Sequence, residues 1–225
     1  MKAAQILLLC SLLACSACDD ADDAANGAGS ELQQLRQQAL QLHNAGQSDE
    51  AIRQFESIAE HPELSASDKA DVLRNISLGY YEAGDYAKSG EYARRAAQLL
   101  PEGSPLYLVN MADAELMAGE VEAAISRLEQ AYRLEPDSLA VNNVLGLIYL
   151  GDNGRQYQDL DKALRLNQAA YRISPNRITR IVLVRTLLAR GEREQAGEHL
   201  RELRETYPQD EQLQHLQQQA EASAG

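Results

Sequence analysis

The chain has 225 residues, a formal net charge of −13 and an isoelectric point near 4.7, and 44% of its residues are apolar. This length allows one or two folded domains, and the composition is typical of a globular chain. The strong negative charge repels phosphate backbones and argues against nucleic-acid binding. Every cysteine precedes residue 19, at Cys10, Cys15 and Cys18, so the rest of the chain has neither disulfides nor a cysteine metal site.

The first residues carry the pattern of a bacterial export signal. Lys2 is followed by an apolar stretch that is shorter than the ~20 residues of a membrane-spanning helix. The segment LLAC, which ends at Cys15, resembles the lipobox of bacterial lipoproteins, whose cysteine thiolate takes a diacylglycerol group before cleavage and which carry palmitate. We therefore expect a signal peptide over residues 1–14 and lipidation of Cys15, with Cys18 as the alternative acceptor. A plain cleaved signal that happens to contain cysteine is the other interpretation.

The expected lipid anchor implies a place in the cell envelope. Several acyl chains hold a protein at a membrane almost permanently, whereas one chain does not. In lipoproteins the residue after the acylated cysteine influences sorting, and Ser16 after Cys15 implies an outer-membrane protein that faces the periplasm. Asp19 after Cys18 would imply the inner membrane. Residues 15–30 are mostly Asp, Ala, Gly and Ser, so we expect a flexible acidic tether there.

From residue 31 onward the chain is predicted to be helical, with turn residues at regular intervals. Four prolines follow one another at spacings of 35, 39 and 33 residues: Pro101, Pro136, Pro175 and Pro208. Three glycines each lie 17 residues before one of these prolines: Gly84, Gly119 and Gly191. This spacing resembles the tetratricopeptide repeat (TPR), a helix–turn–helix unit of about 34 residues.

The resemblance implies an all-α fold, a right-handed α-solenoid of about five repeats over residues 31–210. The expected repeats lie near residues 32–65, 70–103, 105–138, 139–176 and 177–210, and residues 211–225 are expected to form a capping helix with a frayed tail. Small residues recur where the two helices of a unit must approach closely: Ala39, Ser77, Ala112 and Gly146. The fourth repeat carries about five extra residues around 151–159. Glu115, Asn167 and Arg180 depart from the family pattern, which prefers apolar residues there.

In this family the first helices of the repeats line a concave groove, and the resemblance places a mostly apolar set of side chains there. The expected groove residues are Arg74, Leu78, Tyr81, Val109, Asp113, Leu116, Met117, Asn143 and Arg185. Such a groove suits an amphipathic helix or an extended apolar peptide. A register shift of one residue would place several of these side chains in the core instead. Asn75 and Asn110 share one repeat position, where two copies give weak support for an asparagine ladder.

Residues 162–190 contain seven basic side chains and no acidic one, which contrasts with the acidic chain as a whole. The expected basic patch comprises Lys162, Arg165, Arg172, Arg177 and Arg180. It could dock an acidic partner or anionic headgroups. The alternative is a solvated face whose acidic partners lie on neighbouring helices.

Catalytic and metal-binding patterns are missing from the sequence. The four histidines lack motif-like neighbours, and the residues DNG at 152–154 look like a turn without the later ligands of a calcium loop. We therefore expect a protein that is not an enzyme and that binds neither a cofactor nor a metal. The function expected is that of a membrane-anchored periplasmic scaffold that binds protein partners in assembling a pilus or secretion system. The alternative is an accessory subunit of an exopolysaccharide synthesis or export complex.

Overall fold

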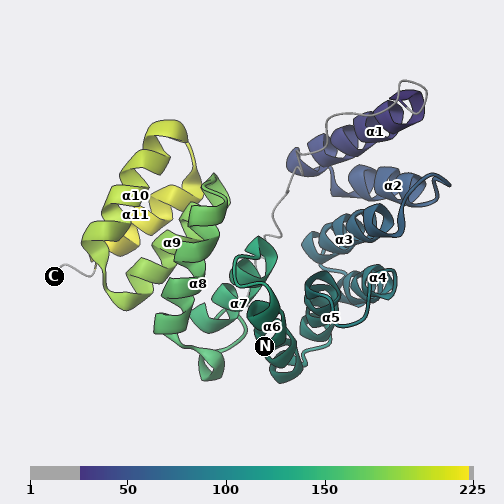
Figure 1. The fold of residues 1–225 in the computed structure, drawn as a ribbon. Helices are drawn as coiled ribbons and strands as arrows, with labels where there is room; N and C mark the ends of the chain where they lie inside the picture. Colours follow the sequence, from purple (N-terminus) through teal and green to yellow (C-terminus); the bar gives the residue numbers. More distant parts are fainter. Residues whose placement is uncertain (1–25, 223–225) are drawn as a thin grey trace. The chain divides into compact units, whose positions relative to one another are not determined.

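The computed structural model describes residues 26–222. Within this range the chain is all-α, with eleven α-helices, one 3₁₀ helix and no strand (Figure 1). The elements are α1 (Asn26–Asn44), α2 (Ser48–Ala59), α3 (Ala66–Glu82), α4 (Tyr86–Gln98), α5 (Pro105–Met117), α6 (Val121–Leu134), α7 (Leu139–Leu150), η1 (Arg155–Tyr157), α8 (Leu160–Ile173), α9 (Arg177–Arg190), α10 (Arg193–Thr206) and α11 (Glu211–Ala222). None of these helices combines the length and the apolar character that crossing a membrane requires.

The described chain forms two compact units, over residues 26–131 and 132–222. The N-terminal unit contains α1 to α5 and most of α6, and the C-terminal unit contains α7 to α11 with η1. The expected signal peptide, Cys15 and Cys18 lie outside the described residues. The expected tether overlaps the structure at its end, because α1 begins at Asn26 and residues 26–30 are helical.

The first helices of three repeats end where the sequence predicts a turn. Gly84, Gly119 and Gly191 adopt φ angles of 81°, 80° and 79°, a left-handed conformation that glycine accepts without a steric penalty.

Serine side chains cap helix starts in the N-terminal unit. Ser65 Oγ accepts a hydrogen bond from the Asp68 N–H at 3.0 Å, so one orphan donor of α3 is satisfied.

The core of the N-terminal unit joins α1, α2, α3 and α4 through small and large side chains in alternation. Ala39 and Ala96 are fully buried beside Phe55 and Ile76, so the helices approach closely around the larger groups.

A polar cluster reinforces this packing at its edge. The rings of Tyr80 and Tyr92 stack with centroids 5.4 Å apart, and both hydroxyls donate to Glu56 Oε1, at 3.4 Å and 2.8 Å. Burial first, and then the Glu56 carboxylate, raises the pKa of both tyrosines.

The core of the C-terminal unit includes the last helix of the chain. Leu187 of α9, Leu200 of α10 and Leu213 of α11 are buried together, and α11 contacts both α9 and α10. A terminal helix that buries leucine on one face closes the apolar end of a repeat stack. The α7 helix is buried along its whole length, in keeping with a mainly apolar composition in which Asn142 and Asn143 are the polar amide residues.

A buried polar contact joins α7, α8 and α9 in the C-terminal unit. Asn167 donates from Nδ2 to Thr186 Oγ1 at 2.9 Å and to the Gly146 carbonyl at 3.4 Å. Gly146 has no side chain to separate the helices, so the amide of Asn167 lies directly against its backbone. Asn167 thus stands where the family prefers an apolar residue, and its side-chain amide finds a hydrogen-bond partner in Thr186 on the next helix.

Candidate partner-binding surfaces

The N-terminal unit holds seven of the expected groove residues, on α3 and α5. On α3, Arg74, Leu78 and Tyr81 are each partly exposed, and their spacing of four and three residues places them on one helix face. On α5 the structure buries three of the expected groove residues and leaves one partly exposed: Val109, Asp113 and Leu116 are buried, and Met117 is partly exposed. The side chains open to solvent are therefore mainly those of α3, with Met117 from α5.

Ion pairs connect α1 to α3 in the same unit. Arg36 Nη1 lies 3.0 Å from Asp68 Oδ1, and Arg36 Nη2 lies 4.0 Å from Asp71 Oδ2. His43 Nε2 lies 3.5 Å from Glu82 Oε1 near the other end of these helices. Ser65 Oγ also donates to Asp68 Oδ2 at 2.6 Å. This hydrogen bond, together with Arg36, lowers the pKa of Asp68 against a smaller opposing effect of burial. Arg36 of α1 thus offsets part of the negative charge that Asp68 and Asp71 place on α3.

Asp113 is the most unusual titratable group of the N-terminal unit. Its side chain is buried, and its Oδ1 has no hydrogen-bond partner within the described chain. Burial raises its pKa to about 7, and the positive charge of Arg74 on α3 only partly opposes that shift. Asn110, one turn earlier on α5, also has a buried Oδ1 without a partner in the described residues. With Glu115 Oε2, three buried hydrogen-bond acceptors of α5 therefore have no partner within the described residues.

Glu115 of α5 is one of the residues that depart from the family pattern, and the structure gives it a partner. Arg127 of α6 donates to Glu115 Oε1 at 2.5 Å, and the glutamate side chain is 10% exposed. A carboxylate in this position thus joins the two helices of the third repeat through a charged hydrogen bond, where the family uses an apolar contact.

The C-terminal unit holds the other two expected groove residues, Asn143 and Arg185. Asn143 of α7 is buried, and its Nδ2 has no hydrogen-bond partner among the described residues. Arg185 of α9 is partly exposed and donates from Nη2 to Asp152 Oδ1 at 2.6 Å. The residues DNG at 152–154 form the expected turn after α7, so Asp152 links that turn to α9.

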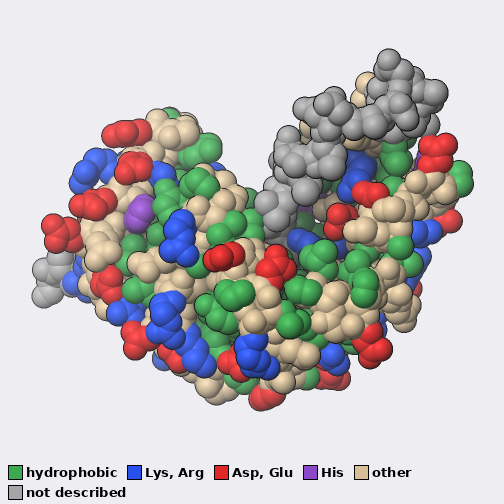
Figure 2. All heavy atoms as spheres, in the orientation of Figure 1, with side chains coloured by type: hydrophobic (Ala, Val, Ile, Leu, Met, Phe, Trp, Pro, Cys, Tyr) green, Lys and Arg blue, Asp and Glu red, His purple; other side chains and the backbone are tan. Residues whose placement is uncertain are grey.

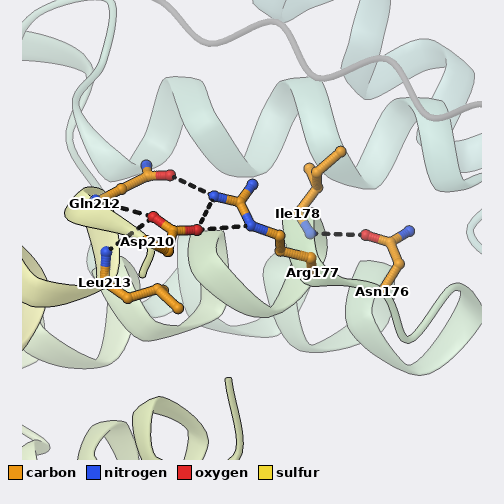
Figure 3. Close-up of polar contacts among 6 residues, drawn as sticks. All are labelled: Asn176, Arg177, Ile178, Asp210, Gln212 and Leu213. Carbon is orange, nitrogen blue, oxygen red and sulfur yellow. Dashed lines mark hydrogen bonds and ion pairs between the residues drawn. The ribbon is translucent and has the colours of Figure 1, made fainter. Parts of the chain in front are cut away.

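Arg177 of the expected basic patch connects α9 to α11 (Figure 3). Its Nε donates to Asp210 Oδ2 at 3.0 Å, and its Nη2 contacts the same oxygen. The other oxygen of Asp210 accepts the N–H groups of Gln212 and Leu213 and so caps the start of α11. Burial alone would raise the pKa of Asp210, but Arg177 and the two backbone N–H groups hold it below its usual value. Arg177 is therefore part of the link that fixes the last helix.

The remaining residues of the expected patch differ in their contacts. Arg180 pairs with Glu202 of α10 at 2.6 Å and lies over the ring of Tyr171. Lys162 donates to the Tyr149 hydroxyl at 3.2 Å. Arg165 and Arg172 are exposed on α8, and neither forms an ion pair within residues 26–222. On the face drawn in Figure 2, basic and acidic side chains are interspersed over these helices.

The C-terminal unit also contains a cavity of about 640 Å³ that the sequence analysis missed. The turn after α7 and η1 form one wall, and α9, the start of α10 and α11 form the others. Three arginines line it: Arg155, Arg185 and Arg193. The extra length of the fourth repeat is the sequence signal that could have indicated it. No group of three or more His, Cys, Asp or Glu side chains suited to a metal occurs in the described residues.

These features define a helical-repeat protein with exposed side chains on its first helices, and comparisons with known proteins identify the family. Two family models of the tetratricopeptide repeat match the sequence, over residues 109–178 and 155–220. No curated protein sequence matches the chain.

Solved structures of TPR proteins resemble the chain. One is TTC0263, a thermophilic TPR protein of Thermus thermophilus, with a TM-score of 0.65 and 19% identity over 84% of this chain and 98% of its own. A TPR protein from Parabacteroides merdae has a TM-score of 0.49 and 15% identity over 85% of this chain and 73% of its own. MamA from Desulfovibrio magneticus has a TM-score of 0.45 and 20% identity over 80% of this chain and 97% of its own.

The chain is a tetratricopeptide repeat protein. Its fold is an α-solenoid of TPR repeats with a C-terminal helix. This fold is that of a scaffold for protein–protein interaction, and proteins with these repeats are generally not catalysts.

Proposed function

We propose that this protein is a membrane-anchored scaffold of the bacterial cell envelope that binds a peptide segment of a protein partner on α3 and α5. The observation that carries the proposal is the α3 face formed by Arg74, Leu78 and Tyr81. An aromatic ring, an aliphatic group and a cation spaced along one partly exposed helix face suit an amphipathic partner helix or an extended apolar segment. Met117 of α5 adds a flexible apolar side chain.

Asp113 gives this surface a polar anchor. Its unsatisfied Oδ1 and that of Asn110 can each accept a hydrogen bond, and an unsatisfied buried acceptor is costly until it is paired. Both acceptors are buried in the free protein, so the side chains that cover them must shift before a partner's backbone N–H or basic side chain reaches Asp113 while its apolar groups cover Leu78 and Tyr81. We therefore expect the bound segment to be apolar with a donor group, rather than uniformly acidic.

The anchor and the location belong to the same proposal. The lipobox-like segment that ends at Cys15 supports an outer-membrane lipoprotein facing the periplasm, with the inner membrane as the location if Cys18 carries the lipid. A scaffold fixed in this way would hold its partner close to the membrane, which suits the assembly of a pilus or secretion system.

Photocrosslinking tests the partner surface. With a photoreactive residue in place of Tyr81 or Met117, we expect the protein in its native host to form a discrete adduct that mass spectrometry identifies as an envelope protein. The same photoreactive residue at Gln130, which is exposed on α6 of the same unit, serves as the control and should capture no such adduct. Identical adduct patterns at all three positions would contradict the proposed surface. A captured polysaccharide synthase or exporter would assign the protein to the other envelope system.

Mass spectrometry of the mature N-terminus tests the anchor. We expect the mature chain to begin at Cys15 with acyl groups on that residue, and Cys15→Ser to release the protein from the membrane fraction. Cys18→Ser is the matched control and should leave the protein in the membrane fraction. An unacylated mature N-terminus would refute the lipoprotein proposal.

A further inference from the structure

The cavity of the C-terminal unit has one wall built from the residues that lengthen the fourth repeat. The Asp159 N–H donates to the Tyr149 carbonyl at 2.9 Å and closes this segment at its base. Gln158 Nε2 donates to the Leu150 carbonyl at 3.0 Å. Gly151 ends α7 with a φ of 106°, which turns the chain sharply into the segment. These contacts hold the added residues in a defined wall beside α9.

Asp152 fixes Arg185 at this wall. The carboxylate is 10% exposed, and its Oδ1 accepts the short hydrogen bond from Arg185 Nη2. An arginine carries five N–H donors, so this pairing positions the guanidinium and leaves other donors for an anion in the cavity that it lines. The second oxygen of Asp152 is buried without a partner in the described chain. The contact through Oδ1 is what orients Arg185 at this site.

Arg155 and Arg193 complete the cationic lining. Arg155 lies in η1, Arg193 is the first residue of α10, and both are exposed. Neither forms an ion pair within the part of the chain that the structure describes. Three arginines against Asp152 leave a local positive excess in a chain whose net charge is −13. A concave site with this sign of charge concentrates anionic ligands.

Apolar side chains share the cavity with the arginines. Leu150 of α7, Leu188 of α9 and Leu216 of α11 contribute to its lining. A volume of about 640 Å³ is within the range of pockets that hold a ligand of several functional groups. Leucines beside arginines favour a ligand that carries both carboxylates and apolar groups. The net negative charge of the protein disfavours nucleic acid and an anionic membrane surface as ligands.

We propose that this cavity binds an acidic peptide segment of a protein partner. Carboxylates of Asp or Glu in the peptide pair with Arg155 and Arg193, Arg185 donates to a third acceptor, and an apolar side chain between them contacts the leucines. The inference rests on the proposed function as a protein-binding scaffold, to which it adds a second site with a defined ligand chemistry.

Peptide display on the purified full-length protein tests this site. Random dodecamers are selected on the unaltered protein and then challenged with two double variants, R155E/R193E and R201E/R204E. Both variants change the net charge equally, but the second pair is exposed on α10 outside the cavity lining and outside the expected basic patch. We expect enriched peptides with paired acidic and apolar residues, whose affinity falls by about tenfold or more in R155E/R193E and less than about threefold in R201E/R204E. Replacing the peptide's acidic residues by Asn and Gln should cause a similar loss.

The outcomes separate the two proposals. Enriched peptides without acidic residues, or equal losses in both double variants, would overturn the cavity proposal and leave the scaffold proposal standing. Phosphatidylglycerol vesicles that bind through Arg155 and Arg193, with no acidic peptide enriched, would assign the cavity to lipid headgroups and overturn it as well. If no peptide binds and no partner is crosslinked from Tyr81 or Met117, the scaffold proposal itself fails.

Discussion

Gly146→Ala is expected to destabilise the C-terminal unit by about 3 kcal/mol or more. A Cβ on Gly146 would lie 2.1 Å from Asn167 Oδ1 and 2.9 Å from its Cγ, distances that packed atoms do not reach. Asn167 is buried and cannot move aside without losing its hydrogen bond to Thr186 Oγ1. The added methyl group therefore combines overpacking with the loss of a buried polar contact.

The C-terminal unit offers a matched control for this substitution. Gly197 lies inside α10, and a Cβ there would meet no atom within 4 Å. Gly197→Ala should therefore stabilise the protein by about 0.5–1 kcal/mol, because alanine loses less conformational entropy in a helix. Urea unfolding followed by circular dichroism measures both variants. Asn167→Ala in the Gly146→Ala background removes the clash and should recover part of the loss. Equal stability of the two glycine variants would contradict the close approach of α7 and α8.

The spacing of turn residues carried most of the information about the fold. Gly84, Gly119 and Gly191 recur at fixed distances from prolines, and each takes the left-handed conformation that a helix end requires. Such signals are local, since a turn depends on the residues that form it. The start of α1 at Asn26 was not predicted, because alanine and glycine in that segment also suit a tether.

The residues that depart from the repeat pattern show what local reasoning misses. Glu115 pairs with Arg127, Asn167 with Thr186, and Arg180 with Glu202. Each departure replaces an apolar contact with a polar contact on another helix. A sequence pattern registers the unexpected residue, but it does not show the partner that satisfies it.

Charge counting along the chain has a related limit. Arg36 pairs with Asp68, 32 residues away, while Arg185 pairs with Asp152 and Arg177 with Asp210, each 33 residues away. These separations are close to one repeat, so stacked repeats bring such residues together. The basic residues of one segment can therefore pair with acidic residues about one repeat away, which a count within that segment does not include. Arg155 and Arg193 of the cavity escaped prediction because they lie in η1 and at the start of α10, whereas Arg185 of α9 was among the expected groove residues.

Asp113→Asn is expected to stabilise the N-terminal unit at alkaline pH. The pKa of Asp113 is about 7 in the folded protein, above its ordinary value of 3.8, because burial disfavours the charged form. The folded state therefore binds a proton that the unfolded state has released between about pH 4 and pH 7. The free energy of unfolding therefore falls as pH rises from about 4 to about 7. Above that range Asp113 is ionised in both states and adds no further pH dependence.

The size of the effect follows from the shift in pKa. A shift from 3.8 to about 7 corresponds to at most about 4 kcal/mol at pH 8, and an asparagine of the same shape avoids this cost. Near pH 4 the aspartate is protonated in the folded state, and the variant should differ little from the unaltered protein. Urea unfolding at pH 4.5, 6 and 8 measures the difference. Glu91→Gln, an exposed residue of α4, makes the same change of charge and should alter stability by less than about 0.5 kcal/mol throughout.

The same titration links stability to partner binding. Ionisation of Asp113 in its buried site costs free energy, and Arg74 offsets only part of that cost. Any further hydrogen-bond donor that reaches the carboxylate therefore stabilises its charged form. A bound segment with an N–H or a basic group at Asp113 would lower the pKa and so bind more tightly above pH 7 than below pH 6. Affinity for the crosslinked partner segment should show this pH dependence in the unaltered protein and lose it in Asp113→Asn. A variant that keeps the full dependence would place the titrating group elsewhere and remove Asp113 from the binding surface.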